Sequence, residues 1–330
     1  MIVLQNSTGN QQVDSILRGL ISPYEMMFPE RIRGYYLMGS YMDASAGAIS
    51  DIDLYILFKQ CFLNETEEKK AHDLRDASAL LSPMRLDILL LSEEQLKPED
   101  VRLKVASRLV YGEDIRDKLP LPTKEAYNRS ITQWPLHFYR RIHQREVLHF
   151  PLHSPQPDAP FYGYTTITIA QWYPSAIQQG TKEFVAATCW TATALVALQA
   201  GQYVGKKADA IKAYGEVIAD EWTIFLQEVY TKCCQVWEYR VPDDTSDRVT
   251  LESLCRRMIV FENHYLSVYK AYLLQQLQGK KRDAILFAAK QLQEVIYPDQ
   301  EVVSILRVIK YEHDVELQQA IMQAIECIQG

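Results

Sequence analysis

The sequence predicts an α+β domain with a small mixed sheet over residues 1–122, followed by an all-α helical bundle domain over residues 123–330. The first 110 residues read in the order helix, strand, strand, helix, strand, which is typical of a small α+β unit. From residue 163 onward nearly every segment spaces its apolar residues as a helix does. The proline-rich stretch LPLPT, residues 119–123, separates the two parts, and 330 residues are enough for two domains.

Each element of the first domain has a reason in the local sequence. Residues 10–30 place apolar side chains at helical spacing, and residues 34–39 form a short apolar strand after a glycine. Two further strands, rich in β-forming residues, are expected at residues 51–58 and 84–92. Between them the sequence predicts a helix that Asn64 or Thr66 caps, and one more element ends at Gly112.

The second domain is expected to consist of long helices. The predicted segments are residues 124–150, 183–200, 206–240, 248–278, 281–296 and 299–328. The run HFYRRIHQR, residues 137–145, is expected to form the polar face of a helix. Residues 184–200 carry no charge, but they fall short of the ~20 residues that a membrane span needs and include threonines and glutamine. We therefore expect a buried helix and no membrane partner.

Composition excludes several classes of function. A formal net charge of −7 argues against a protein that wraps nucleic acid, so a nucleic-acid partner is not expected. The six cysteines show no C-x-x-C spacing, which favours free thiols in a reducing compartment. The start of the chain lacks the basic and apolar regions of a signal peptide, and we expect a cytoplasmic protein. The sequence does not define the oligomeric state.

The strand at residues 51–58 carries two acids, Asp51 and Asp53, among apolar residues. Because strand side chains alternate, both acids project from one face, while Ile52, Leu54 and Ile56 project from the other face into the core. Two ionised carboxylates this close repel each other, and a divalent cation removes that cost. Mg²⁺ prefers oxygen ligands and usually combines one or two carboxylates with substrate phosphates. The pair therefore predicts a metal and a phosphate-bearing substrate.

A glycine and a serine before this strand supply the second half of the predicted site. Gly39 allows a ligand to approach the backbone closely, and Ser40 with the following N–H groups can bind phosphate oxygens. Asp87 is a third acid inside an apolar strand. If its strand lies beside residues 51–58, three carboxylates meet at one sheet edge and can hold two metal ions. Asp87 could alternatively act as a general base.

None of these signals is specific by itself, since paired acids often form solvated turns at strand ends. The ordered set is more informative: GSYMDASAGAISDIDLYIL, residues 39–57, resembles the signature of the nucleotidyltransferase superfamily of the polymerase-beta type. Ser50 before Asp51 matches its common Ser-Asp-Ile-Asp form. The chain further resembles the aminoglycoside adenylyltransferases that add a C-terminal helical domain, through VYGEDIRDKLPLP and TATALVALQAGQYVGKKADAIKAY, residues 110–122 and 191–214.

The resemblance implies roles for the individual residues. Asp51 and Asp53 would be metal ligands, and Asp87 would be the third ligand or the catalytic base. The nucleotide-binding residues would be Gly39, Ser40, Ser50, Lys206 and Lys207.

The resemblance also implies a Mg²⁺-dependent enzyme with two ions and ATP or another nucleoside triphosphate as donor. It would transfer a nucleoside monophosphate to a hydroxyl of a small molecule, such as an aminoglycoside-like compound, and release pyrophosphate. Transfer to a protein or RNA acceptor and a non-catalytic nucleotide-binding module are the alternatives. Two departures leave the acceptor open: the loop after Gly-Ser reads YMDAS without the usual basic residue or glycine, and the helical domain is longer than in the antibiotic-modifying members.

Overall fold

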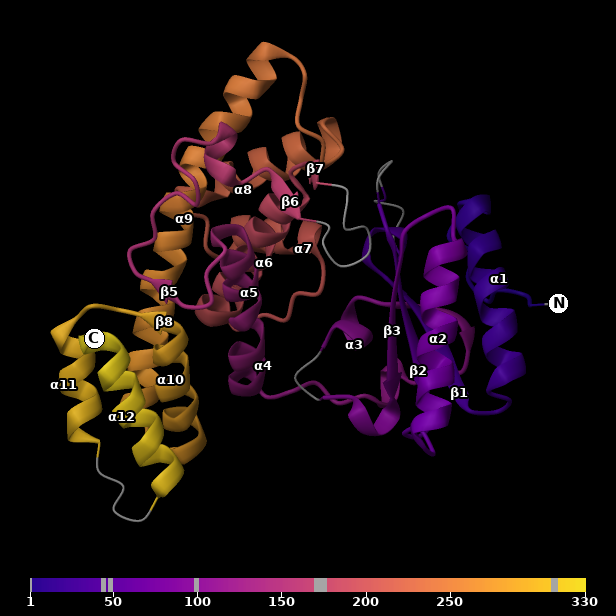
Figure 1. The fold of residues 1–330 in the computed structure, drawn as a ribbon, viewed down its shortest axis with the longest axis horizontal. Coiled ribbons are helices and arrows are strands. Elements are labelled where there is room, and N and C mark those ends of the chain that lie inside the picture. Colours follow the sequence, from indigo (N-terminus) through magenta and orange to yellow (C-terminus); the bar gives the residue numbers. More distant parts are fainter. Residues whose placement is uncertain (1, 43–45, 47–49, 98–100, 169–176, 310–313) are drawn as a thin grey trace. The chain divides into compact units, whose positions relative to one another are not determined.

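The computed structural model describes residues 2–42, 46, 50–97, 101–168, 177–309 and 314–330. Contacts divide the chain into two units (Figure 1). The first unit comprises Met1–Tyr127 and Tyr203–Lys206, and the second comprises Asn128–Gln202 and Lys207–Gly330. We expected a boundary after residue 122; the division by contacts falls five residues later and returns residues 203–206 to the first unit.

The first unit is built on a four-stranded mixed sheet with the order β3-β2-β1-β4. β1 pairs antiparallel with β2 and with β4, and β2 pairs parallel with β3. The strands are β1 (Ile32–Met38), β2 (Ile52–Phe58), β3 (Leu86–Ser92) and β4 (Arg108–Gly112). This confirms the predicted mixed sheet and places the strand that contains Asp87 beside the strand that contains Asp53.

The two faces of the sheet are covered differently. Ile52, Leu54 and Ile56 of β2 enter the larger apolar core beneath α1 (Gln11–Met27) and α2 (Glu65–Leu81). Tyr55 and Leu57 join a smaller cluster on the other face, with Leu103 of α3 (Arg102–Val105) among its members. Figure 1 shows α1 and α2 on one side of the sheet and α3 on the other. The predicted alternation of β2 is therefore confirmed.

Side-chain caps define where the first two helices begin. The Asn10 side chain accepts hydrogen bonds from the N–H groups of Gln12 and Val13, and Asn64 accepts one from Glu67 at 2.9 Å. Each cap satisfies backbone donors that have no partner inside the helix. Of the two residues that the sequence offered as the cap of α2, the structure uses Asn64.

The second unit is mainly helical, as predicted. α4 (Lys124–Ile131) spans the division between the units. The regular helices that follow it are α5 (Gln133–His143), α6 (Lys182–Ala200), α7 (Lys207–Val217), α8 (Trp222–Val229), α9 (Thr245–Gln278), α10 (Arg282–Glu294), α11 (Gln300–Val308) and α12 (Val315–Gln329). A π-helical segment, Tyr230–Val236, follows α8. Short strand pairs that the sequence did not indicate join β5 (Leu148–His149) to β8 (Val295–Ile296) and β6 (Thr166–Thr168) to β7 (Ile177–Gln179).

Two of the long predicted helices break at residues with left-handed backbone. Residues 124–150 do not form one helix, because Gln144 adopts φ +52° and ends α5. Residues 206–240 break at Ala219, which has φ +53°. The Asp220 carboxylate then accepts a hydrogen bond from the Trp222 N–H at 2.9 Å at the start of the next helix. The prediction of continuous helices was wrong at these two points.

α6 is the one helix, within the described part of the chain, that is long and apolar enough to cross a membrane. In its most apolar window 72% of the residues are buried inside the structure. Its threonines donate to carbonyl groups one turn earlier, with distances of 2.8 Å for Thr188, 2.7 Å for Thr191 and 2.9 Å for Thr193. These features are those of a core helix, as the sequence predicts.

Candidate functional site

Strand register brings the predicted acids to one end of the sheet. Met38, the last residue of β1, pairs with Asp53, and Asp53 pairs with Asp87 of β3 in parallel register. Residues paired in this way lie about 4.8 Å apart and project their side chains from the same face. Leu37 pairs with Arg108, so the start of β4 lies at the same end. The sequence could place each acid in a strand, and the register makes Asp53 and Asp87 neighbours.

Gly39 is in direct contact with the Asp53 carboxylate. Its φ is +64°, in the left-handed region that favours glycine, and it begins a short 3₁₀ turn, Gly39–Met42. A Cβ atom at this position would lie 2.0 Å from Asp53 Oδ2. Only a glycine therefore leaves room for the carboxylate against the turn. The Gly-Ser pair and the acid belong to one local arrangement.

Asp51 lies just before β2, and its side chain is 15% exposed. Its Oδ2 atom is 3.9 Å from Arg85 Nε, and the neighbouring backbone is fixed by a 2.9 Å bond from the Ile52 N–H to the Arg85 carbonyl. Burial, and secondly the negative charge of Asp51, raise the pKa of Tyr41 in the turn after Gly39. The Asp51 charge therefore acts on a side chain of this turn.

The remaining predicted residues differ in their positions. Ser40 is half-buried in the turn, and Ser50 is half-buried directly before Asp51. Residues 43–45 and 47–49, most of the loop that the resemblance includes, lie outside the described residues. Lys206 belongs to the first unit, while Lys207 begins α7 of the second, with its Nζ atom 5.6 Å from the centre of the Tyr239 ring. The two lysines, predicted together, are thus divided between the units.

Two arginines near this end of the sheet were not singled out from the sequence. Arg108 donates from Nη2 to the Tyr41 carbonyl at 3.0 Å, and its Nε atom is buried without a hydrogen-bond partner. Arg102 of α3 lies over the ring of Tyr55, 5.9 Å from its centre, and Tyr55 shares a face with Asp53. The basic pattern VRLKVASR before the last strand is the signal that could have identified them.

The donor chemistry of this site fits Mg²⁺. Asp53 and Asp87 occupy paired positions on neighbouring strands, and hard cations prefer carboxylate oxygens as ligands. Among the described residues no three His, Cys, Asp or Glu side chains are grouped to hold a metal by themselves. Mg²⁺ commonly needs only one or two protein carboxylates when phosphate oxygens complete its coordination. The site as it stands therefore fits a metal that arrives with a phosphate ligand.

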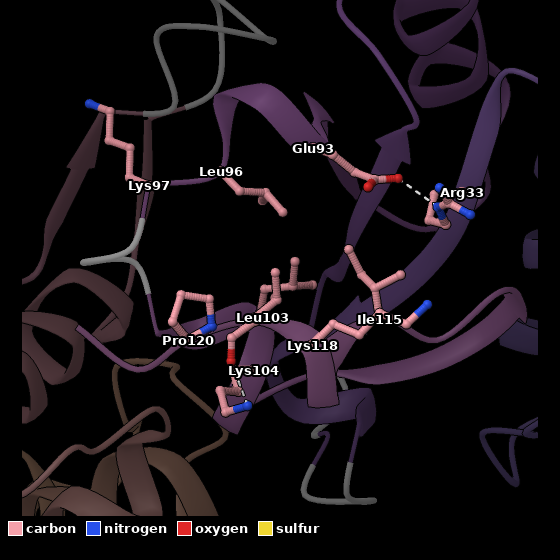
Figure 2. A pocket seen from close by; sticks show the side chains of 10 residues that line it. Arg33, Glu93, Leu96, Lys97, Leu103, Lys104, Ile115, Lys118 and Pro120 are labelled. Carbon is pink, nitrogen blue, oxygen red and sulfur yellow. Dashed lines mark hydrogen bonds and ion pairs between the residues drawn. The ribbon is translucent and has the colours of Figure 1, made fainter.

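A cavity of about 330 Å³ lies near the opposite end of the strands, with Arg33 at the start of β1 and Glu93 just after β3 (Figure 2). Leucine, isoleucine and proline side chains line it beside this ion pair, which joins Arg33 Nε to Glu93 Oε1 at 2.5 Å. Lys104 donates to the backbone carbonyls of Arg116 and Leu119. These charged groups are bonded within the protein, and the cavity contains none of the predicted site residues.

Comparison with known proteins adds little to this geometry. No family model matches the chain, and no curated protein matches it. Among solved structures, a spectinomycin adenyltransferase from Enterococcus faecialis, crystallised with ATP and spectinomycin, is similar at 12% identity and a TM-score of 0.46. The similarity covers 77% of this chain and 99% of that chain. The residues of the site, and not these similarities, therefore indicate the function.

Proposed function

We propose that the protein is a Mg²⁺-dependent nucleotidyltransferase that moves a nucleoside monophosphate, AMP from ATP in the first instance, to a hydroxyl group. The observation that carries this proposal is the parallel pairing of Asp53 with Asp87, with the Asp53 carboxylate held against Gly39. The mixed sheet followed by a helical unit is consistent with a nucleotidyltransferase-like domain joined to a helical domain. Two carboxylates can bind the metal of a metal-bound triphosphate, and the glycine turn beside them leaves room for its phosphates.

The phosphate groups of the donor are bound by the turn at the end of β1 and by basic residues around it. Gly39 lets the phosphates approach the backbone, and Ser40 supplies a hydroxyl donor. Arg108 donates to the Tyr41 carbonyl and brings positive charge beneath the turn. Lys206 reaches the phosphates with a flexible charged side chain, and Lys207 and Ser50 remain predicted contacts.

Asp51, Asp53 and Asp87 would hold Mg²⁺ together with the phosphate oxygens. When bound, the metal neutralises charge that develops on the phosphates and aligns the leaving group. The Asp53 carboxylate can occupy its position against the turn because Gly39 has no Cβ atom. Asp87 is exposed at the neighbouring strand position and is open to an incoming acceptor.

The reaction follows from this arrangement. The acceptor hydroxyl loses its proton to Asp87, its oxygen forms a bond to the α-phosphorus, and the bond from that phosphorus to the bridging oxygen breaks. Pyrophosphate leaves with the electron pair of the broken bond. The acceptor would be a small molecule, and a cationic aminoglycoside-like compound matches the net charge of −7. We place the enzyme in the cytoplasm.

The test compares Asp53→Asn and Asp87→Asn with the wild-type chain. We expect Asp53→Asn to abolish Mg²⁺-dependent ATP binding in calorimetry. Asp87→Asn should weaken Mg²⁺-dependent ATP binding less than Asp53→Asn does. It should slow pyrophosphate release with a hydroxyl acceptor about 10²–10⁴-fold at saturating Mg²⁺-ATP, because it removes the general base as well as one metal ligand. Asp73→Asn, which changes an exposed aspartate of α2, is the matched control and should behave as wild type.

The other outcomes of this test would either indicate a different function or contradict the proposal. Nucleotide binding without pyrophosphate release, across a screen of sugar, protein and RNA acceptors, would favour a binding module. Release with a protein or RNA acceptor alone would change the substrate class and keep the chemistry. If neither ATP nor the other three nucleotides bind to the wild-type chain, the proposal is wrong.

A further inference from the structure

An arginine that the proposed function does not use lies at the same end of the sheet as the acids. Arg85 comes directly before β3, and Asp51 comes directly before β2. The Ile52 N–H donates to the Arg85 carbonyl at 2.9 Å, and Ile52 pairs with the residue that follows Arg85. The parallel register of the two strands therefore places Asp51 and Arg85 next to each other.

The alternation of side chains along the strands brings four charged groups to one face. Arg85 and Asp87 are two positions apart, so their side chains project from the same face of the sheet. The same spacing relates Asp51 to Asp53, which pairs with Asp87. These four positions hold three negative charges and one positive charge, and the positive charge lies at the edge of the proposed metal site.

The Arg85 side chain faces Asp51. Its Nε atom lies 3.9 Å from Asp51 Oδ2, which is too far for a hydrogen bond but close enough for the two charges to attract each other. The Asp51 side chain is 15% exposed, whereas that of Arg85 is 54% exposed. The carboxylate is thus largely shielded from water, and the guanidinium can move away from it into solvent.

A positive charge at this position acts differently on the two forms in which a metal can arrive. A bare divalent cation is repelled by Arg85 and has to compete with it for Asp51. A Mg²⁺-ATP complex carries a net negative charge, because the triphosphate outweighs the metal, so Arg85 attracts the complex as a whole. The arginine therefore disfavours the bare ion and favours the complex.

We infer that Arg85 makes the site select a divalent cation that is already bound to a nucleoside triphosphate over the bare ion. This inference rests on the proposed function. In the nucleotide-free protein the guanidinium offsets the charge of Asp51, so the neighbouring acids can remain together without a metal. When the complex binds, Arg85 gives up Asp51 to the metal and moves toward solvent.

The experiment measures two affinities for the wild-type chain and for Arg85→Met: that for Mn²⁺ without nucleotide, by electron paramagnetic resonance, and that for Mg²⁺-ATP, by calorimetry. We expect Arg85→Met to bind free Mn²⁺ about tenfold more tightly, because it removes both a competitor for Asp51 and a repelling charge. Its affinity for Mg²⁺-ATP should not rise. The preference for Mg²⁺-ATP over the bare ion should therefore fall about tenfold or more.

Two control variants separate the position of the charge from its presence in the chain. Arg85→Lys keeps a positive charge beside Asp51 and should bind free Mn²⁺ nearly as the wild type does. Arg75→Met removes the same charge from α2, where Arg75 Nε donates to Asp76 at 2.8 Å. It should change neither affinity, because α2 covers the opposite face of the sheet.

Thermal unfolding provides a second readout. Without metal, Arg85→Met leaves the acids to repel one another and should lower the Tm of the chain. Mn²⁺ should then raise the Tm of Arg85→Met more than that of the wild type, because tighter binding to the folded state stabilises it more. An arginine with a merely structural role would lower the Tm by the same amount with and without Mn²⁺.

The outcomes distinguish this inference from the proposed function. If Arg85→Met gains no affinity for free Mn²⁺, or if Arg75→Met gains as much, the inference is wrong, while Mg²⁺-ATP binding to the wild-type chain leaves the proposed function intact. A wild-type chain that binds no Mg²⁺-ATP would overturn both.

Discussion

The two units hold their acidic side chains in opposite ways. In the helical unit Glu262 is 0% exposed, and its Oε2 atom lies 2.8 Å from His143 Nε2 and 3.0 Å from the Tyr164 hydroxyl. In the first unit Asp53 and Asp87 occupy paired positions at the end of the sheet, and Asp87 is exposed. A buried acid bonded to donors of its own chain stabilises the fold, whereas two adjacent acids favour a cation from outside. The comparison separates a structural acid from acids that are available to a ligand.

The hydroxyl that faces Glu262 remains a donor at neutral pH. Burial, and secondly the negative charge of Glu262, raise the pKa of Tyr164 well above its usual value. The Oε1 atom of Glu262 is buried without a hydrogen-bond partner, so the group depends on the bonds to Oε2. Removing the carboxylate would leave the polar groups of His143 and Tyr164 without the partner that they share.

The largest expected effect on stability is therefore at this buried acid. We expect Glu262→Ala to lower the free energy of unfolding of the helical unit by about 2–5 kcal/mol, because His143 and Tyr164 each lose a buried hydrogen-bond partner at about 1–3 kcal/mol. All five tryptophans lie between residues 134 and 237, within the helical unit's part of the sequence, so tryptophan fluorescence during urea unfolding measures this unit. Mg²⁺-ATP affinity, measured well below the transition, should stay unchanged, because none of the proposed ligands contacts Glu262.

Glu252→Ala is the control for this prediction. Glu252 is a half-exposed acid of α9 that pairs with Arg256 at 3.5 Å. Its loss should cost less than 1 kcal/mol, as is usual for surface pairs. If Glu262→Ala were no more destabilising than Glu252→Ala, the contrast between structural and available acids would not hold.

A smaller effect is expected at Gly39, where the fold and the proposed site meet. Gly39→Ala forces a Cβ atom into a left-handed conformation, which costs about 1–2 kcal/mol, and drives it against the Asp53 carboxylate. We expect Mg²⁺-ATP binding to weaken together with the stability. The matched control is Gly19→Ala in α1, where no atom lies within 4 Å of the new Cβ. That change should stabilise the unit by about 0.5–1 kcal/mol, and equal effects at both glycines would contradict the proposed contact.

The smallest effect concerns Asp14, a structural acid of the first unit. Burial alone would raise the pKa of Asp14, but hydrogen bonds from Ser7 and Thr8, with Arg18 nearby, outweigh it and hold that pKa below its usual value. A carboxyl whose pKa is lowered by folding stabilises the protein above its unfolded pKa, and this stabilisation disappears as the pH falls through the folded pKa.

We therefore expect Asp14→Asn to cost about 1 kcal/mol at pH 7, measured by hydrogen exchange of the α1 amides. The difference from wild type should be constant down to about pH 5 and should shrink below about pH 4. A difference that grows on acidification would show that the pKa of Asp14 is raised. Asp73→Asn again serves as the exposed control.

Most of the secondary structure of the first unit could be predicted from local patterns in the sequence. The period of two in residues 51–58 places Ile52 and Leu54 in the core and Asp53 on the opposite face, as observed. The cap at Asn64 and the acidic first turn of α2 are likewise signals within a few residues of one another. Such features depend on near neighbours, so they can be recognised without knowledge of the rest of the chain.

The same kind of reasoning was wrong where burial depends on distant residues. The run at residues 137–145 was expected to be a polar helix face, but His143 is buried because Glu262, 119 residues later, lies beside it. One predicted helix is interrupted at Ala219, and the positive φ of this residue could not be predicted from its residue type. No local pattern contains the partner that makes these conformations favourable.

By itself, the sequence determined the fold class and the residue types of the candidate site: a mixed sheet, a glycine turn and acids inside apolar strands. Only the tertiary structure decided that Asp53 lies beside Asp87, that Arg108 bonds to the turn and that residues 203–206 belong to the first unit. Alternation and capping depend on backbone geometry over a few residues. Strand register and close packing between residues about 100 positions apart depend on how the whole unit buries its apolar surface.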